Sequence, residues 1–193
     1  MSDDHEYQAR LQRLNETHTN TTMIHAGSFL THRLDDIILP NGEPARREVI
    51  DHPGGVVILP VLEDGRFVLV WQYRYAISQL LLEFPAGKLE VGEDPLSCAK
   101  RELEEETGYA AKQWQDWHYI HTAPGFTNER LYLFHASGLE ALENPKTEED
   151  EFIELGYYTH TELTDMMAAG KLTDAKTISA LFCYQNKARF GVQ

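Results

Sequence analysis

The sequence has few cysteines and no long apolar run. Its two cysteines, Cys98 and Cys183, cannot form a disulfide framework, and no Cys/His cluster has the spacing of a structural zinc site. The longest apolar stretch, Val56 to Leu62, is far shorter than the roughly 20 residues that a helix needs to cross a bilayer. The chain starts with acidic and polar residues, which disfavours a secretory signal. We therefore expect a cytoplasmic protein without a membrane partner.

Basic residues are also scarce. Against 31 Asp and Glu there are 17 Lys and Arg, so the formal net charge is −14. Proteins that bind a phosphate backbone present clustered Lys and Arg, and nucleic acid is therefore not an expected partner. A polyphosphate ligand would have to bind together with cations. The 193 residues, 42% of them hydrophobic, fit one globular domain with an appendage.

Turn signals and periodicity divide the chain at about residue 52. Residues 1–22 are polar and predict a short helix or an arm, and extended runs up to residue 52 predict a small antiparallel strand unit. In the domain expected over residues 53–193, two apolar runs around Asp64-Gly65 predict a hairpin. Further strands are expected over 114–122, 131–136 and 152–158, and helices over 94–107, over 161–169 and from 174.

Acidic residues gather on the helix expected over 94–107. Glu102, Glu105 and Glu106 are three and four residues apart, so their carboxylates share a helix face and should repel one another. Charge alone is compatible with a solvated acidic face. It is equally compatible with a hard-cation site, where carboxylate oxygens suit Mg²⁺ or Mn²⁺ and the metal removes the repulsion.

The spacing of these acids favours the cation site. In GKLEVGEDPLSCAKRELEEETGY, fixed intervals separate Gly87, Glu93, Arg101-Glu102, Glu105-Glu106 and Gly108. The segment resembles the Nudix box at every fixed position. The resemblance implies a Mg²⁺-dependent hydrolase that acts on a nucleoside diphosphate linked to another moiety. The expected fold class is α/β: a Nudix α/β/α sandwich with a mixed sheet, plus the N-terminal antiparallel strand unit.

The Nudix resemblance also implies roles for individual residues. The expected ligands of Mg²⁺, with Mn²⁺ as the alternative ion, are Glu102, Glu106, Glu105 directly or through water, the carbonyl of Ala86, and Glu151. Glu93 and Arg101 would form an ion pair that fixes the geometry of these ligands, the alternative being a plain surface pair.

A general base is expected in the acidic loop Thr147 to Glu151. The loop lies just before a predicted strand, on a segment able to close over the substrate, and the resemblance implies that the base sits there. Alignment of the loop suggests Glu149 as the base, and Glu148 would take that role if the register shifts by one. An ordinary solvated turn is the alternative.

A second resemblance concerns the substrate. The segment TAPGFTNERLYLF contains Pro124, fifteen residues after Tyr109, and a Pro-Gly-Phe-x-x-Glu element. It is similar to the ADP-ribose pyrophosphatase subfamily. The resemblance implies substrate contacts from Arg74 to the diphosphate, from Glu129 to the terminal ribose, from Gly125 and Phe126, and from Arg46 and Glu48 across the subunit boundary of a homodimer.

The leading expectation is therefore Mg²⁺-dependent hydrolysis of ADP-ribose to AMP and ribose 5-phosphate, with other nucleoside diphosphate sugars as further substrates. One alternative is a Nudix hydrolase for GDP-mannose or another nucleotide sugar, a dinucleotide or a nucleoside triphosphate. The other alternative is a catalytically silent nucleotide sensor.

Overall fold

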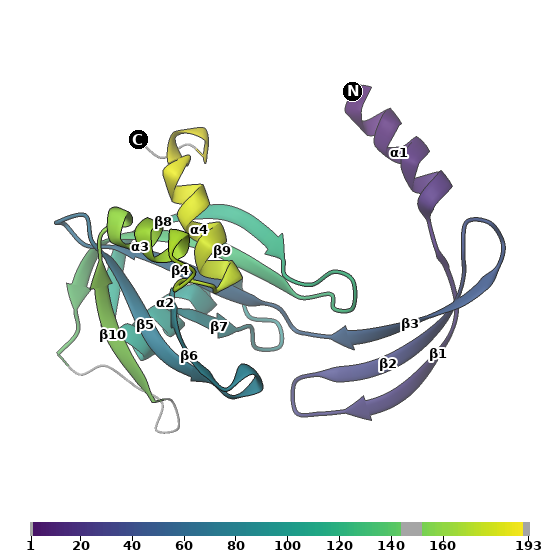
Figure 1. The fold of residues 1–193 in the computed structure, drawn as a ribbon, viewed down its shortest axis with the longest axis horizontal. Helices are drawn as coiled ribbons and strands as arrows, with labels where there is room; N and C mark the ends of the chain where they lie inside the picture. Colours follow the sequence, from purple (N-terminus) through teal and green to yellow (C-terminus); the bar gives the residue numbers. More distant parts are fainter. Residues whose placement is uncertain (1, 144–151, 191–193) are drawn as a thin grey trace. The chain divides into compact units, whose positions relative to one another are not determined.

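The computed structural model describes residues 2–143 and 152–190. Contacts divide the chain into two compact units (Figure 1). The N-terminal unit comprises Met1–His52 together with Ala123–Glu129, and the main unit comprises Pro53–Thr122 and Arg130–Gln193. The functional division predicted from sequence, a dimerisation unit over 1–52 and a hydrolase domain over 53–193, stays a prediction.

The N-terminal unit contains a helix and a three-stranded antiparallel sheet. Helix α1 (Ser2–Leu14) precedes strands β1 (Thr17–Ala26), β2 (Thr31–Ile38) and β3 (Pro44–Asp51), which pair in that order. The predicted arm up to residue 22 is wrong from residue 17 onward. Its polar residues form β1, where the side-chain hydroxyl of Thr21 donates to Asp35 on β2 at 2.7 Å. This strand lacks the alternating apolar pattern that usually indicates a strand, and cross-strand hydrogen bonds between polar side chains stabilise it instead.

The Pro-Gly-Phe segment adds to this unit. The amide of Ile50 on β3 donates to the carbonyl of Phe126 at 2.7 Å, and the amide of His52 donates to the side-chain oxygen of Asn128 at 2.8 Å. These two hydrogen bonds hold residues 123–129 against the end of β3.

The main unit is built on a seven-stranded mixed sheet. The strand order is β10-β5-β4-β9-β8, with β6 pairing β5 and β7 pairing β4. Strands β4 and β9 are parallel, and the other pairs are antiparallel. The strands are β4 (Gly55–Val61), β5 (Phe67–Arg74), β6 (Gln79–Glu83), β7 (Ala86–Lys88), β8 (Tyr109–His121), β9 (Arg130–Ala141) and β10 (Ile153–Tyr158), and a 3₁₀ turn η1 (Tyr75–Ile77) lies between β5 and β6.

Helices cover both faces of this sheet. Alternate residues of β4 point in opposite directions, as in any strand. Val56 and Ile58 pack against α2 (Pro95–Thr107), in one apolar core. Val57 and Leu59 belong to a second core, which includes residues of α3 (His160–Ala168) and α4 (Ala175–Gln185). A 3₁₀ turn, η2 (Lys187–Phe190), follows α4. The predicted α/β/α sandwich with a mixed sheet is confirmed (Figure 1).

Helix α2 begins and ends where the sequence predicts. The side chain of Asp94 caps its first turn by accepting from the amide of Ser97 at 3.0 Å, and Pro95 occupies the first helical position. Gly108 ends the helix in the left-handed conformation at φ +69°, which glycine adopts without steric cost. These ends fix which face of α2 meets the sheet. Within the described part of the chain, no helix is long and apolar enough to cross a membrane.

Candidate active site

The acidic face of α2 turns toward the sheet. Glu102 and Glu106, one helical turn apart, are only 9% and 6% exposed. Carboxylates are rarely so buried unless they are paired or bind a metal. Glu104 on the same helix is exposed, so the burial is specific to one face of α2. A merely solvated acidic face, the alternative considered from sequence, is therefore wrong for these two residues.

The strand β7 lies close against that face. The amide of Ala86 donates to Oε2 of Glu106 at 3.0 Å. A Cβ atom added to the next residue, Gly87, would lie 1.8 Å from the carboxyl carbon of Glu102. No side chain can be accommodated there while Glu102 keeps its position, because a contact this short is impossible. The first glycine of the box is thus needed for the approach of Glu102 to the backbone of β7.

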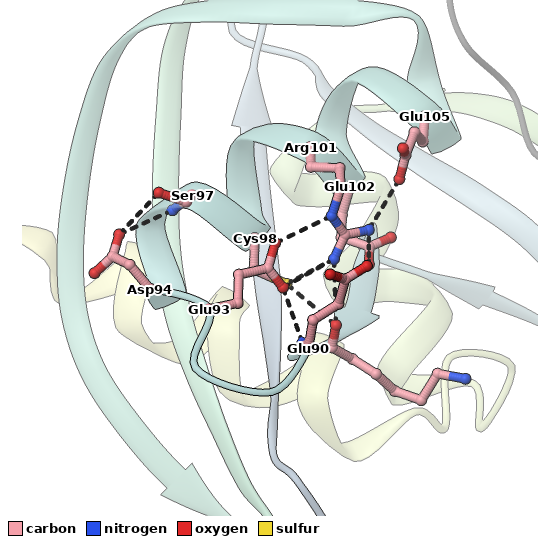
Figure 2. Close-up of polar contacts among 9 residues, drawn as sticks. Glu90, Glu93, Asp94, Ser97, Cys98, Arg101, Glu102 and Glu105 are labelled. Carbon is pink, nitrogen blue, oxygen red and sulfur yellow. Dashed lines mark hydrogen bonds and ion pairs between the residues drawn. The ribbon is translucent and has the colours of Figure 1, made fainter. Parts of the chain in front are cut away.

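Arg101 connects the other acids of the box (Figure 2). Its Nε and Nη2 donate to the two carboxylate oxygens of Glu93 at 3.1 Å each, which is the fork geometry of a strong ion pair. Its Nη1 donates to Glu102 at 2.8 Å and to Glu105 at 2.9 Å. The structure therefore brings together the predicted pair of Arg101 and Glu93, and Arg101 also holds two of the predicted metal ligands.

Arg101 and Glu93 stabilise each other's charged forms. The hydrogen bonds that Arg101 donates to Glu93, followed by the charge of Glu102 and the hydrogen bonds to Glu105 and Glu102, raise the pKa of Arg101. The hydrogen bond from Arg101 lowers the pKa of Glu93. Cys98 packs beneath the fork, where its thiol donates to the carbonyl of Lys88 at 3.3 Å, and burial raises the pKa of this thiol to about 12.

Arg74 is the predicted diphosphate contact, and it lies at the end of β5. Its Nε and Nη2 donate to the two carboxylate oxygens of Glu83 at 2.8 and 2.6 Å. The pKa of Arg74 is raised, and the hydrogen bonding with Glu83 is the largest cause. The negative charges of Glu106 and Asp174 raise it further. Arg74 is thus within electrostatic reach of an acid of the box.

Glu83 itself was missed by the sequence analysis. It ends β6, is 1% exposed and also pairs with Lys176. Burial alone would raise its pKa, but the hydrogen bonds and charges of Arg74 and Lys176 together lower it. The available signal was a single carboxylate within the apolar run Leu80 to Phe84, which calls for a buried partner.

The remaining predicted substrate residues belong to the N-terminal unit. Arg46 and Glu48 lie two apart on the exposed face of β3. There Arg46 donates to Asp36 at 2.9 Å, and Glu48 lies 3.8 Å from the ring nitrogen of His32. Their role in binding nucleotide stays a prediction.

The Pro-Gly-Phe element supplies three more predicted contacts. Glu129 lies 3.5 Å from Nε2 of His52, and the side chain of Phe126 is 57% exposed. A Cβ atom at Gly125 would meet nothing within 4 Å, so packing alone does not require glycine there. Glu149, Glu151 and the alternative base Glu148 lie outside the described residues.

The NUDIX domain of known proteins matches residues 51–181. The chain belongs to the Nudix family. The predicted enzyme class, a Nudix hydrolase, is thereby confirmed, and the box residues described above are those of a family member.

Curated relatives cover most of this Nudix chain. It is 40% identical to the methanol dehydrogenase activator of Bacillus methanolicus over 162 residues. This match covers 83% of this chain and 88% of that protein. It is 36% identical over 184 residues to the ADP-ribose pyrophosphatase of Bacillus subtilis strain 168, over 95% of this chain and 100% of that protein.

A solved structure shares the fold. The crystal structure of an ADP compounds hydrolase matches with a TM-score of 0.79 at 21% identity, covering 90% of this chain and 94% of that chain. At this level of identity the likeness shows the fold alone, and it agrees with the Nudix sandwich.

Nudix hydrolases use divalent metal ions, and the acids of α2 fit such an ion chemically. Carboxylate oxygens are the donors that hard cations prefer. Glu93, Glu102 and Glu105 share the single positive charge of Arg101, so this group of acids carries surplus negative charge. Among residues 2–143 and 152–190, no three His, Cys, Asp or Glu side chains are arranged to hold a metal, and Glu102 and Glu105 instead share Arg101.

Proposed function

We propose that this Nudix hydrolase cleaves the pyrophosphate bond of ADP-ribose with Mg²⁺, releasing AMP and ribose 5-phosphate, and that other nucleoside diphosphate sugars are secondary substrates. The observation that carries the proposal is the buried pair Glu102 and Glu106, of which Glu106 lies within electrostatic reach of Arg74. Similarity to an ADP-ribose pyrophosphatase along that protein's whole length supports the choice of substrate.

The box residues would hold the metal. Glu102, Glu106, Glu105 and the Ala86 carbonyl are the proposed ligands, with Glu151 as a further one and Mn²⁺ as the alternative ion. Bound there, Mg²⁺ would neutralise charge on the diphosphate and lower the pKa of an attacking water. Glu102 and Glu105 are kept in place by Arg101, which Glu93 in turn orients.

Two further groups complete the proposed chemistry. The side chain of Arg74 is 41% exposed and its guanidinium is fixed on one side by Glu83, so the other N–H groups can donate to diphosphate oxygens. Glu149 is the proposed general base that takes the proton of the attacking water, and Glu148 would take this role in the shifted register.

The substrate's ends would bind to the N-terminal unit. We assign the terminal ribose to Glu129 beside Gly125 and Phe126, and the nucleotide to Arg46 and Glu48 from the partner subunit of a homodimer. All ten residues of β1 are exposed, which supports the exchange of N-terminal strands between subunits. The cytoplasm is the proposed location, in keeping with the scarcity of cysteine.

Product analysis tests the proposed function. The purified chain is incubated with ADP-ribose, GDP-mannose, other nucleotide sugars, a dinucleotide and a nucleoside triphosphate at millimolar Mg²⁺, with EDTA as the control. We expect EDTA-sensitive release of AMP and ribose 5-phosphate, faster than hydrolysis of any other substrate. Faster hydrolysis of another compound would assign the enzyme to that substrate instead of ADP-ribose. If no compound is hydrolysed, the alternative of a catalytically silent nucleotide sensor is favoured.

Light scattering tests the dimer separately. We expect a mass about twice the 22.1 kDa of one chain. A monomer would contradict both the strand exchange and the cross-subunit roles of Arg46 and Glu48.

A further inference from the structure

Glu83 is the most deeply buried carboxylate of the main unit among the described residues. Its neighbours in sequence, Leu82 and Phe84, are 2% and 0% exposed and belong to the core beneath α3 and α4. A buried charge of this kind is unfavourable unless ionic partners and hydrogen bonds compensate for its lost hydration. Replacing such a buried ionic cluster as a whole by well-packed apolar side chains is often neutral or stabilising. Its presence therefore calls for an explanation beyond packing.

Both oxygens of Glu83 are used. Oε1 accepts from Nε of Arg74 at 2.8 Å, and Oε2 accepts from Nη2 of Arg74 at 2.6 Å and from Nζ of Lys176. Lys176 also donates to Asp174 at 3.0 Å, and Asp174 caps α4 by accepting from the amide of Thr177 at 3.0 Å. Glu83 is thus anchored through Lys176 to the first turn of a packed helix.

The anchor determines the orientation of Arg74. A bidentate bond to a fixed carboxylate removes most of the freedom of a long, flexible side chain. The guanidinium uses Nε and one Nη2 hydrogen on Glu83, and within the described ranges no other acceptor contacts its remaining N–H groups. The Arg74 side chain is 41% exposed, whereas the side chains of Lys176 and Asp174 are only 13% and 14% exposed. Of these three side chains, Arg74 is therefore the most accessible to a ligand.

We propose that Glu83 is a positioning residue of the reaction: it fixes the guanidinium of Arg74 for contact with the substrate's diphosphate, and Lys176 secures Glu83 from α4. This inference rests on the proposed function, because it requires that Arg74 binds the diphosphate. Lys176 acts through Glu83 in this scheme and needs no contact with the substrate. The alternative is that the four charges only stabilise the fold.

A double-mutant cycle separates these roles. Glu83→Gln keeps the shape of the side chain but cannot accept the charged fork, and we expect it to lower kcat/KM by about 10- to 100-fold, as loss of a supporting hydrogen bond typically does. In the Arg74→Ala background the same change should lower kcat/KM by less than about twofold, since its target is gone. Equal losses in both backgrounds would overturn the inference.

Chemical rescue gives a readout that fold stability does not affect. Guanidinium chloride at tens of millimolar should partly restore kcat/KM of Arg74→Ala, because Glu83 offers a binding site for the free cation. The same salt should not restore Arg74→Ala/Glu83→Gln. Equal rescue of the two variants, or rescue of neither, would contradict the proposal. Sodium chloride at the same concentration controls for ionic strength.

Controls address folding. Glu140→Gln removes an exposed carboxylate that pairs with Lys112 on the neighbouring strand, and it should leave kcat/KM unchanged. Thermal unfolding is followed for every variant. If Glu83→Gln does not fold, Glu83→Gln/Lys176→Met, which removes one charge of each sign, replaces it in both arms of the cycle.

The two proposals fail differently. A wild-type chain that hydrolyses none of the tested compounds would contradict the proposed function and this inference with it. A wild-type chain that is active, with additive effects of Glu83→Gln and Arg74→Ala, would overturn the positioning role alone. The cycle is therefore run with whichever compound the wild-type chain hydrolyses fastest.

Discussion

At the scale of single residues, the decisive feature is that two carboxylates of one helix are buried while a third is exposed. Glu106→Gln removes the charge of a buried acid that accepts from the amide of Ala86. We expect kcat to fall on the order of 10³-fold, since a lost metal ligand costs several kcal/mol of transition-state stabilisation. Glu104→Gln, on the exposed side of α2, is the matched control. Normal turnover of Glu106→Gln at saturating Mg²⁺ would refute the ligand assignment.

Gly87 allows a second test at this scale. In Gly87→Ala the new methyl group would overlap the carboxylate of Glu102, so that side chain must move away from β7. We expect kcat to fall at least about 100-fold and the Mg²⁺ concentration for half-maximal activity to rise, because one ligand is displaced. A variant with an unchanged Mg²⁺ titration would show that Glu102 does not hold the metal from this position.

The cysteines provide a third residue-scale prediction. Cys98 is fully buried, and burial followed by the charges of Glu102 and Glu93 raises the pKa of its thiol to about 12. Burial also raises the pKa of Cys183. Because the thiolate is the reactive form, neither residue should react with iodoacetamide at pH 8 in the folded protein, and both should react in urea. Mass spectrometry of the alkylated chain checks this, and rapid labelling of folded protein would contradict it.

At the scale of elements, the ends of α2 place its acidic face. Asp94→Ala removes the cap on Ser97, and we expect a loss of about 1 kcal/mol in the free energy of unfolding with kcat nearly unchanged. Urea denaturation measures this loss. Asp165→Ala, in the exposed part of α3, is the control and should change stability by less than about 0.5 kcal/mol. A large loss of kcat in Asp94→Ala would mean that the cap also holds the site.

Elements with a local signal were predictable, and elements defined by distant partners were not. The capping aspartate, the proline and the glycine of α2 are all local, and the sequence predicts that helix within a residue. Strands β6 and β7 were not predicted, because the segment from Gln79 to Lys88 owes its conformation to pairing with β5 and β4. The same holds within the site: fixed spacing identifies Arg101 and Glu93, whereas the contact of Glu83 with Lys176 joins residues 93 apart in sequence.

At the scale of the whole molecule, acid should destabilise the fold through His135. This residue lies on β9, is 9% exposed and stacks on Trp117 with ring centroids 5.3 Å apart. Burial, with a smaller effect of the charge on Lys187, lowers its pKa to about 4. The folded chain therefore binds the proton more weakly than the unfolded chain, whose histidine keeps the ordinary value near 6.5.

The sign of the pH dependence follows from this difference. Above pH 6.5 the histidine is neutral in both states and costs nothing; as the pH falls from 6.5 toward 4, the unfolded state takes up the proton first and gains stability. We expect the wild-type chain to lose about 2 kcal/mol over this window from His135, after allowing for solvent screening. Urea unfolding at pH 7.5 and pH 4.5 measures the loss.

The variant His135→Gln isolates this contribution, because it keeps a polar side chain that does not titrate. Its free energy of unfolding should be lower than that of the wild type at pH 7.5, since the ring stacking is lost, but it should decline less steeply toward pH 4.5. The matched control is His25→Gln on the exposed strand β1, which should follow the wild-type slope. If the free energies of unfolding of His135→Gln and of the wild type fall in parallel toward pH 4.5, the acid sensitivity of the molecule arises from groups other than His135.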